Sequence, residues 1–307
     1  MTAPWLAGAT VAVTGASGFC GAAVARAAAA AGATVVGLGR RPGPVGTHRP
    51  WDAAAGAPDL GGVDAVVHLA AAVGDPGGGR GADAAFRAVN VDGGARLLEA
   101  AGARPVVWVS SASVYDPRLD RSRVTEDHPL AGQLNAYART KAAGDVLAQR
   151  AGAVVLRPHA VYGPGDRHLL PRLRRAVRLG RVLLPGPDVR ISLTAVENLA
   201  DACLLGTRWP PGAYNVADAT AYDRDEVVAD VLAAAGRAVR VRHVPLAVAE
   251  GAARVLGRLP LRAPLLTPYA VDQVGHTVVL DTGRAAAQGY VPRRTVADYL
   301  TGLRAAR

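Results

Sequence analysis

The sequence predicts an α/β protein with a doubly wound parallel sheet and a smaller C-terminal lobe, and three observations lead to this prediction. Short, unbroken apolar runs alternate with longer helical patterns in the first half of the 307-residue chain. A glycine-rich turn joins the first apolar run to the first helix. Beyond about residue 160, proline-rich connections replace this alternation. Unbroken apolar strands of this kind belong to a parallel sheet that helices cover on both faces.

The expected elements follow this alternation from the N-terminus onward. Residues 10–14 form a buried strand, a glycine turn at 15–21 leads into an alanine-rich helix that ends near Gly32, and a second strand covers 33–38. This order of strand, helix and strand is a βαβ unit. The later strands are expected at 64–69, 105–110 and 153–156, and the later helices at 84–101, 136–150, 196–206 and 224–235.

These elements predict two parts of the chain. Residues 1–160 form a dinucleotide-binding domain of the Rossmann type, and residues 161–307 form mainly a substrate-binding lobe. A segment at about 194–217 is expected to return to the first domain. The glycine run at 74–81 is expected to be a flexible connection, with a lid as the alternative.

Composition excludes several classes of protein. Half of the residues are hydrophobic and 20% are charged, which excludes disorder as the main state. The net charge of +10 raises the question of nucleic-acid binding, but the arginines are spread over both halves and aromatic residues make up only 5%. We therefore expect no nucleic-acid partner. No Lys or Arg precedes Arg26, and no apolar stretch is long enough for a spanning helix, so neither a signal peptide nor a membrane span is expected.

The two cysteines, Cys20 and Cys203, lie far apart and form no CxxC motif. They predict neither a disulfide framework nor a metal site, and they favour a reducing, cytoplasmic location.

The glycine turn predicts a dinucleotide site. Gly15, Gly18 and Gly21 stand where a strand gives way to a helix, so that exposed amides and the positive end of the helix dipole face a phosphate. Such glycines also occur in tight turns that bind nothing. The βαβ context favours dinucleotide binding.

The end of the second expected strand indicates which cofactor is bound. Proteins of this fold that use NAD carry an acidic residue here for the adenosine ribose, but this chain has Gly39, Arg40 and Arg41. Guanidinium groups can pair with a 2′-phosphate, so NADP(H) is favoured over NAD(H). The alternative is a pair of solvated surface arginines.

Lys141 is the only lysine among 35 Lys and Arg residues, and Tyr137 lies four residues before it on an expected helix. This spacing puts both side chains on one face. A general-acid tyrosine needs its pKa lowered from about 10 to about 7, or about 4 kcal/mol, which a nearby ammonium and an oxidised nicotinamide can supply. The alternative is an exposed Tyr and Lys on a helix surface.

Hydroxyl groups follow the expected strand at 105–110. Ser111 and Ser113 lie at its carboxyl end, where open α/β sheets place their ligand crevice. Either serine can bind a substrate carbonyl, and either can instead cap a turn.

A set of ordered motifs makes the chain resemble the extended short-chain dehydrogenase/reductase family, in its NAD-dependent epimerase/dehydratase group. The motifs cover 14–21, 68–71, 90–91, 110–115, 137–141 and 156–165. The resemblance implies Ser111, Tyr137 and Lys141 as the catalytic set, Asp52 near the adenine, and a homodimer formed through the helices near 84–101 and 136–150. The implied cofactor-binding residues are Gly15, Ser17, Gly18, Phe19, Gly21, Arg40, Arg41, Asp52, Leu69, Ala70, Ala71, Lys141 and Pro158.

Two departures from the family pattern bear on the substrate. Ala160 stands where nucleotide-sugar members usually have an asparagine, and Arg190 to Leu193 replace their Arg-Asp-Tyr triplet. The tail is more similar to dihydroflavonol reductases and members resembling 3β-hydroxysteroid dehydrogenases. Against this, the arginines of 167–181 can grip an anion, although a solvated basic helix face is favoured.

The expected function is an NADP(H)-dependent oxidoreductase that interconverts a ketone and a secondary alcohol on a small molecule. The first alternative is a nucleotide-sugar epimerase, dehydratase or 4-ketoreductase that uses the same residues. The second is an NADP(H)-binding regulator without catalysis, and the intact catalytic set counts against it.

Overall fold

The computed structural model describes residues 4–75, 80–166, 169–256 and 266–305. A seven-stranded, entirely parallel sheet forms its centre, in the order β11-β6-β5-β4-β1-β2-β3. The strands are β1 (Thr10–Thr14), β2 (Thr34–Gly39), β3 (Thr47–Pro50), β4 (Ala65–His68), β5 (Val106–Val109), β6 (Val154–Pro158) and β11 (Gly212–Val216). The predicted doubly wound parallel sheet is confirmed.

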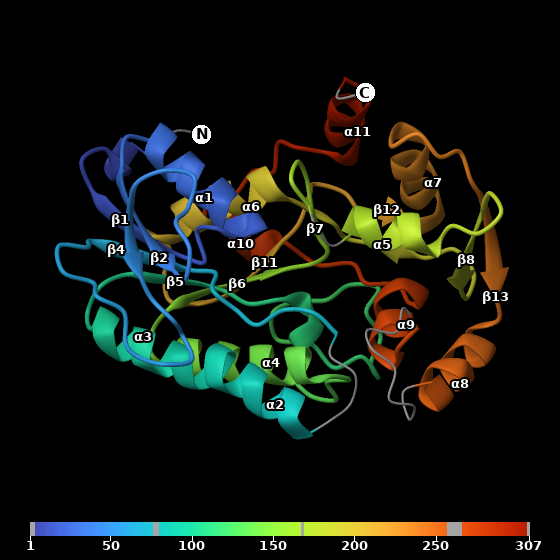
Figure 1. Ribbon diagram of the computed structural model, residues 1–307, viewed down its shortest axis with the longest axis horizontal. Coiled ribbons are helices and arrows are strands. Elements are labelled where there is room, and N and C mark those ends of the chain that lie inside the picture. The colour runs from blue at the N-terminus through green and yellow to red at the C-terminus, as the bar shows by residue number, and fades with distance from the viewer. Residues whose placement is uncertain (1–3, 76–79, 167–168, 257–265, 306–307) are drawn as a thin grey trace.

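Helices cover both faces of this sheet, as Figure 1 shows. α1 (Phe19–Ala30) and α6 (Val196–Gly206) pack on one face, where their alanines, valines and leucines meet the strand side chains. α3 (Gly93–Ala101) and α4 (Ala136–Arg150) pack on the other face. The two hydrophobic clusters so formed hold the strands rigidly, which fixes the positions of the loops at the strand ends.

The predicted helix at 84–101 is a composite. It consists of α2 (Arg80–Arg87), a π-helical turn η2 (Ala88–Asp92) and α3. The wider turn brings the Asn90 side chain inward, where it bonds to the loop after β4 and to Thr140 of α4. Local sequence periodicity does not reveal this, because the turn is stabilised by contacts to distant segments.

The other sequence-based boundaries lie close to those observed. α4 and α6 begin and end at the predicted residues, and α7 (Arg224–Ala234) ends one residue early. The sequence analysis did not predict β3 or β11 as strands. β3 is a short polar edge strand, and β11 carries Asn215 and follows two prolines, so neither has the apolar run used to find the others.

The C-terminal part gathers at one end of the sheet, in yellow-green to orange-red in Figure 1, and short β pairs connect its helices. Helix α9 (Pro268–Gly275) of this part lies beside the loop that follows β5. Strand β11, by contrast, pairs with β6 within the main sheet. The remaining elements are η1 (Pro4–Leu6), η3 (Ala112–Val114), β7 (Val161–Tyr162), α5 (Leu169–Ala176), β8 (Arg181–Pro185), β9 (Arg190–Ile191), β10 (Thr194–Ala195), β12 (Tyr222–Asp223), β13 (Arg240–Val244), α8 (Leu246–Leu256), α9 (Pro268–Gly275), α10 (Gly283–Ala287) and α11 (Val296–Ala305).

Two sequence-based interpretations fall partly outside the described residues. Positions 76–79 of the glycine run and Arg167 of the basic segment are not described. Within the described ranges, no helix is both long enough and apolar enough to cross a membrane.

Candidate active site

The parallel sheet brings the predicted site residues to one edge, because the carboxyl ends of parallel strands lie together. Strand order reverses between β1 and β4, which is the place where such sheets form a ligand crevice. The residues at this edge are Gly15, Ser17, Gly18, Phe19 and Gly21 after β1, Arg40 and Arg41 after β2, Asp52 after β3, Leu69, Ala70 and Ala71 after β4, Ser111 after β5, and Pro158 at the end of β6.

The glycine turn fits closely against its neighbours. Gly15 has a φ of +68°, and a Cβ there would lie 3.0 Å from the Ala70 amide nitrogen. A Cβ on Gly21 would lie 2.2 Å from the Gly15 carbonyl oxygen. Gly18 is the N-cap of α1 and brings no side chain to the helix terminus, so the first amides of α1 remain open to a ligand. This cradle fits the diphosphate of a dinucleotide.

Polar side chains beneath the crevice hold its rim in place. The Thr14 hydroxyl accepts hydrogen bonds from the amides of Leu69 and Ala70 at 3.0 and 2.9 Å. Asn90 accepts from the Ala72 amide at 2.7 Å and donates to its carbonyl at 3.1 Å. Thr14 and Asn90 are therefore positioning residues for the loop after β4.

Arg40 and Arg41 follow β2 directly and are exposed. Within the described ranges, no acidic side chain pairs with either guanidinium. The Gly15 amide donates to the Leu38 carbonyl at 2.8 Å, which keeps this strand end beside the glycine turn. Asp52 is also exposed, and its carboxylate accepts the Ala54 amide at 2.9 Å in a local turn.

Ser111, Tyr137 and Lys141 lie together. Tyr137 is in the first turn of α4, which the Asn135 side chain caps by accepting the Ala138 amide at 2.8 Å. The Ser111 hydroxyl lies near enough to the Tyr137 phenol to lower its pKa. Lys141 lies one turn further on, is buried, and donates to the Val109 carbonyl at 2.5 Å.

The ionisation of this cluster differs from the sequence-based expectation. Burial raises the pKa of Tyr137, the Ser111 hydroxyl only partly offsets this, and Cys20 adds to the rise. Lys141 is not among the groups that shift the Tyr137 pKa here, and its ammonium is directed to the Val109 carbonyl. Burial lowers the pKa of Lys141 itself to about 8, while Asp145 and Cys20 oppose that change.

Cys20 is a site residue that the sequence analysis missed. It lies in the first turn of α1, just after the Gly18 N-cap, and is partly buried. Burial raises its pKa to about 12, so the thiol is neutral. The sequence could have predicted Cys20 as a site residue, because it lies between Gly18 and Gly21 of the glycine turn.

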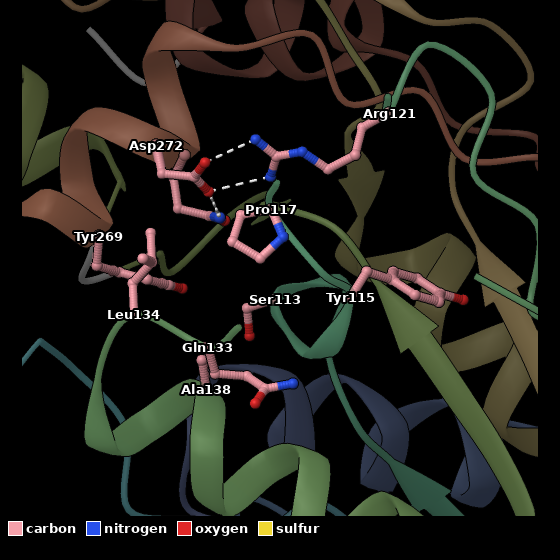
Figure 2. Close-up of a pocket in the computed structure, with 10 residues that line it drawn as sticks. Ser113, Tyr115, Pro117, Arg121, Gln133, Leu134, Ala138, Tyr269 and Asp272 are labelled. Carbon is pink, nitrogen blue, oxygen red and sulfur yellow. Dashed lines mark hydrogen bonds and ion pairs between the residues drawn. The ribbon is translucent and has the colours of Figure 1, made fainter. Parts of the chain in front are cut away.

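A pocket adjoins the cluster of Ser111, Tyr137 and Lys141, between the loop after β5 and helix α9 (Figure 2). Arg121 and Asp272 form a buried bidentate ion pair in its wall, with N–O distances of 3.0 and 2.6 Å. The side-chain amide of Gln273 donates to the same carboxylate at 3.1 Å. The charges of Arg121 and Asp272 in the wall thus compensate each other.

Tyr269 extends from α9 into this pocket, and its ring lies edge to face with Tyr137 at a centroid distance of 6.4 Å. The sequence analysis missed it. Thr267 followed by Pro268 is a typical helix start and could have predicted α9, but it could not have placed that helix beside α4.

The basic segment lies apart from this pocket lining. Arg174, Arg175, Arg178 and Arg181 are exposed. Arg174 donates to the Ala235 carbonyl at 3.4 Å, and Arg178 donates to the carbonyls of Arg175 and Val177. These contacts favour the reading of a solvated basic face.

The sheet order, the glycine cradle and the cluster of Ser, Tyr and Lys together define an oxidoreductase of the extended short-chain dehydrogenase/reductase type. The chain belongs to the NAD dependent epimerase/dehydratase family, whose model matches residues 11–217.

Relatives within this group include ketoreductases. The chain is 30% identical to the 2-alkyl-3-oxoalkanoate reductase of Stenotrophomonas maltophilia, over 95% of this chain and 98% of that protein. It is 30% identical to the 4-hydroxy-2-methyl-3-oxo-4-farnesyl-3,4-dihydroquinoline-1-oxide ketoreductase of Stigmatella aurantiaca, over 80% of this chain and 78% of that protein. The solved structure of MoeE5 in complex with UDP-glucuronic acid and NAD is 26% identical, with a TM-score of 0.72 over 96% of this chain and 97% of that chain.

Proposed function

We propose that the protein is an NADP(H)-dependent ketoreductase that interconverts a ketone and a secondary alcohol on a small organic molecule. The observation that carries this proposal is the cluster of Ser111, Tyr137 and Lys141, which lies between the glycine cradle and a charge-compensated pocket. Both ketoreductase relatives act on oxo compounds, which supports the same reaction class.

The catalytic residues have distinct roles in this proposal. Ser111 donates a hydrogen bond to the substrate carbonyl oxygen, and Tyr137 transfers its proton to that oxygen during reduction. Because burial raises the pKa of Tyr137, the phenol is protonated before the cofactor binds and holds the proton that reduction consumes. In oxidation, the tyrosine accepts the proton of the alcohol.

Lys141 would serve the cofactor. One N–H of its ammonium bonds to the Val109 carbonyl, and an ammonium has two more, which suit the hydroxyl groups of a ribose. A bound nicotinamide dinucleotide would supply or accept the hydride and, when oxidised, a positive charge that favours the phenolate.

Arg40 and Arg41 support NADP(H) as this cofactor. Both are exposed beside the glycine turn, where the adenosine ribose of a dinucleotide lies in this fold, and no acid stands between them and the turn. Two guanidinium groups would pair with a 2′-phosphate. Asp52, after β3, is proposed to lie near the adenine.

The nucleotide-sugar reading is the second candidate, and the fold of MoeE5 favours it. Ala160 opposes it, because its methyl group cannot bind a phosphate. Ala160 has a φ of +41°, a backbone conformation that asparagine adopts more readily than alanine does. The compensated charge of Arg121 opposes it as well.

The proposal is tested by mixing the purified protein with NADPH and a panel of aliphatic, cyclic and aryl ketones, and following the loss of NADPH absorbance. Reduction of one or more ketones is expected. Conversion of UDP-sugars without any ketone reduction would favour the second candidate, and cofactor binding without turnover of either class would favour a regulator.

We also propose a homodimer formed through the helical segment 84–101 and α4, and a cytoplasmic location that suits the free thiols of Cys20 and Cys203. Analytical ultracentrifugation is expected to give twice the mass of the chain. A single-chain mass at micromolar concentration would contradict the dimer.

A further inference from the structure

A chain of four hydroxyl groups links two tyrosines in the active site. Ser113 donates from its hydroxyl to that of Ser111 at 3.0 Å. Ser111 in turn lies near enough to Tyr137, and Ser113 near enough to Tyr269, for each serine hydroxyl to lower the pKa of the neighbouring phenol. The proposed function uses only the half that contains Ser111 and Tyr137. The other half, Ser113 and Tyr269, faces the pocket (Figure 2).

The position of Tyr269 is fixed by a carboxylate that joins two helices. Asp75 accepts a hydrogen bond at 2.9 Å from Asn135, the N-cap of α4, and another from Thr267, the N-cap of α9. Thr267 also accepts the Ala270 amide at 2.9 Å. The helix that carries Tyr137 and the helix that carries Tyr269 are therefore held together at their N-termini, beside the pocket.

We infer that Tyr269 and Ser113 bind a second oxygen atom of the substrate, so that the enzyme prefers ketones with an uncharged oxygen function one or two carbons from the carbonyl group. This inference rests on the proposed function, because it takes the substrate carbonyl to lie between Ser111 and Tyr137. It makes Tyr269 a specificity-determining residue.

The spacing of the hydroxyl groups fits this class. Ser111 and Ser113 are 3.0 Å apart, and each can bond an oxygen about 2.8 Å away. Two substrate oxygens on carbons separated by one or two bonds of about 1.5 Å have a matching separation. A ketone without the second oxygen would leave Tyr269 and Ser113 with only the partners they already have, and would gain nothing from them.

The charges around Tyr269 argue for an uncharged oxygen rather than a carboxylate. Burial raises the pKa of the Tyr269 phenol, and Tyr137, Asp75 and Asp272 add to that rise, so the phenol remains a neutral donor. Arg121, the cation in the pocket wall, is already engaged by Asp272 in two hydrogen bonds. An additional anion would lie near two carboxylates without a free cation among the described pocket residues.

The decisive experiment compares matched ligands and matched variants. The ligands are a 3-oxo ester, the ketone in which an alkyl group of equal length replaces the ester, and the free 3-oxo acid. The variants are Tyr269→Phe, Ser113→Ala and, as a control, Tyr299→Phe. Tyr299 lies on α11 and packs against Tyr162, outside the pocket. Calorimetric binding and kcat/KM with NADPH are measured for every combination.

The wild type and Tyr299→Phe are expected to bind the ester at least tenfold more tightly than the ketone or the acid. Tyr269→Phe, which keeps the ring, is expected to lose that tenfold preference while its ketone binding changes less than twofold. In turnover, the loss should appear mainly in KM for the ester.

Three results of the comparison between ligands and variants would overturn the inference, and so would a fourth, a general failure to bind. The three are an unchanged preference in Tyr269→Phe, an equal loss for ester and ketone, and tighter binding of the acid than of the ester. Absence of binding by all three ligands at millimolar concentration would also overturn it. Because binding is measured separately, a preference for the ester without any NADPH oxidation would uphold the inference and contradict the proposed reduction instead.

Discussion

Lys141 and Asp145 lie one helical turn apart on the buried side of α4, and the carboxylate raises the pKa of the ammonium against the larger effect of burial. Asp145 is also the partner of Arg157 on β6. Its oxygens accept from the Arg157 guanidinium at 2.9 and 2.8 Å, and both side chains are almost completely inaccessible. One carboxylate therefore joins the helix of the catalytic residues to the central sheet.

Removing this carboxylate is expected to destabilise the fold strongly. Asp145→Ala leaves the Arg157 cation buried and unpaired, which costs about 3–5 kcal/mol in free energy of unfolding. Urea denaturation measures the change. The control is Asp83→Ala, which breaks the exposed pair with Arg139 and should cost less than about 1 kcal/mol. Similar stabilities for the two variants would show that the buried pair contributes little.

Lys141→Met is expected to remove activity without loss of stability at pH 7. Burial lowers the pKa of Lys141 from 10.5 to about 8. At pH 7 the side chain is charged in both states, and its charged form has a higher free energy in the folded protein than in the unfolded chain. The penalty is at most on the order of 3 kcal/mol.

The pKa shift of Lys141 also predicts how the stability difference between Lys141→Met and the wild type changes with pH. Between pH 8 and pH 10.5 the unfolded chain holds the proton of Lys141 more strongly than the folded protein does, so this group makes the wild type more stable as pH rises. The variant lacks this contribution. Thermal unfolding at pH 7 and pH 10 should therefore show an advantage of Lys141→Met that narrows at the higher pH, and a less stable variant at pH 7 would contradict the argument.

Tyr137→Phe tests the proposed acid. It removes the transferable proton and keeps the ring contact with Tyr269, so the protein should still fold and bind cofactor. Turnover is expected to fall on the order of a hundredfold or more, the usual effect of losing a general acid. Tyr299→Phe, which changes a tyrosine outside the pocket, serves as the control. If Tyr137→Phe reduced ketones at nearly the wild-type rate, another group would be the acid.

Local sequence patterns were enough to predict the sheet and the place of the glycine cradle. The capping residue Asn135 and the apolar spacing after it define α4, so its ends could be read from the sequence. The edge strand β3 could not, because its four residues, Thr47 to Pro50, contain no apolar run and gain their structure from pairing with β2.

Contacts between distant residues account for the rest of the site. Tyr269 reaches Tyr137 only because Asp75 joins α4 and α9, and Arg121 meets Asp272 across the pocket. The residues of each pair lie far apart in the sequence, so no local sequence pattern could predict that they meet. The direction of the Tyr137 pKa shift was missed for the same reason, since it depends on burial and on where the Lys141 ammonium points.

Cofactor preference is expected to depend on the two arginines after β2. NADPH should bind at least tenfold more tightly than NADH, a difference of about 1.4 kcal/mol. Replacing Arg40 and Arg41 by Ala should remove this difference by weakening NADPH alone, whereas Arg26→Ala, an exposed arginine on α1, should leave it unchanged. Fluorescence titration with both cofactors measures this. Equal affinities in the wild type would contradict the assignment of NADP(H).

Nucleotide diphosphates are expected not to bind the substrate pocket. Ala160 offers no side-chain donor to a phosphate, and the one arginine that lines the pocket, among the described residues, is bonded to Asp272. Thermal unfolding of the protein saturated with NADPH, so that the cofactor site is filled, should show no shift with millimolar UDP or dTDP.

A bound nucleotide diphosphate would raise the unfolding temperature enough to be seen clearly. A ligand at a hundred times its dissociation constant would stabilise the fold by about 2.7 kcal/mol, which is readily detected. The arginines of α5 and the turn after it provide the contrasting case, because several are exposed and uncompensated by any acid among the described residues. A stabilisation by UDP that disappears when Arg174, Arg175 and Arg178 are replaced by Ala would show that this segment grips a diphosphate, and it would place the nucleotide-sugar reaction ahead of ketone reduction.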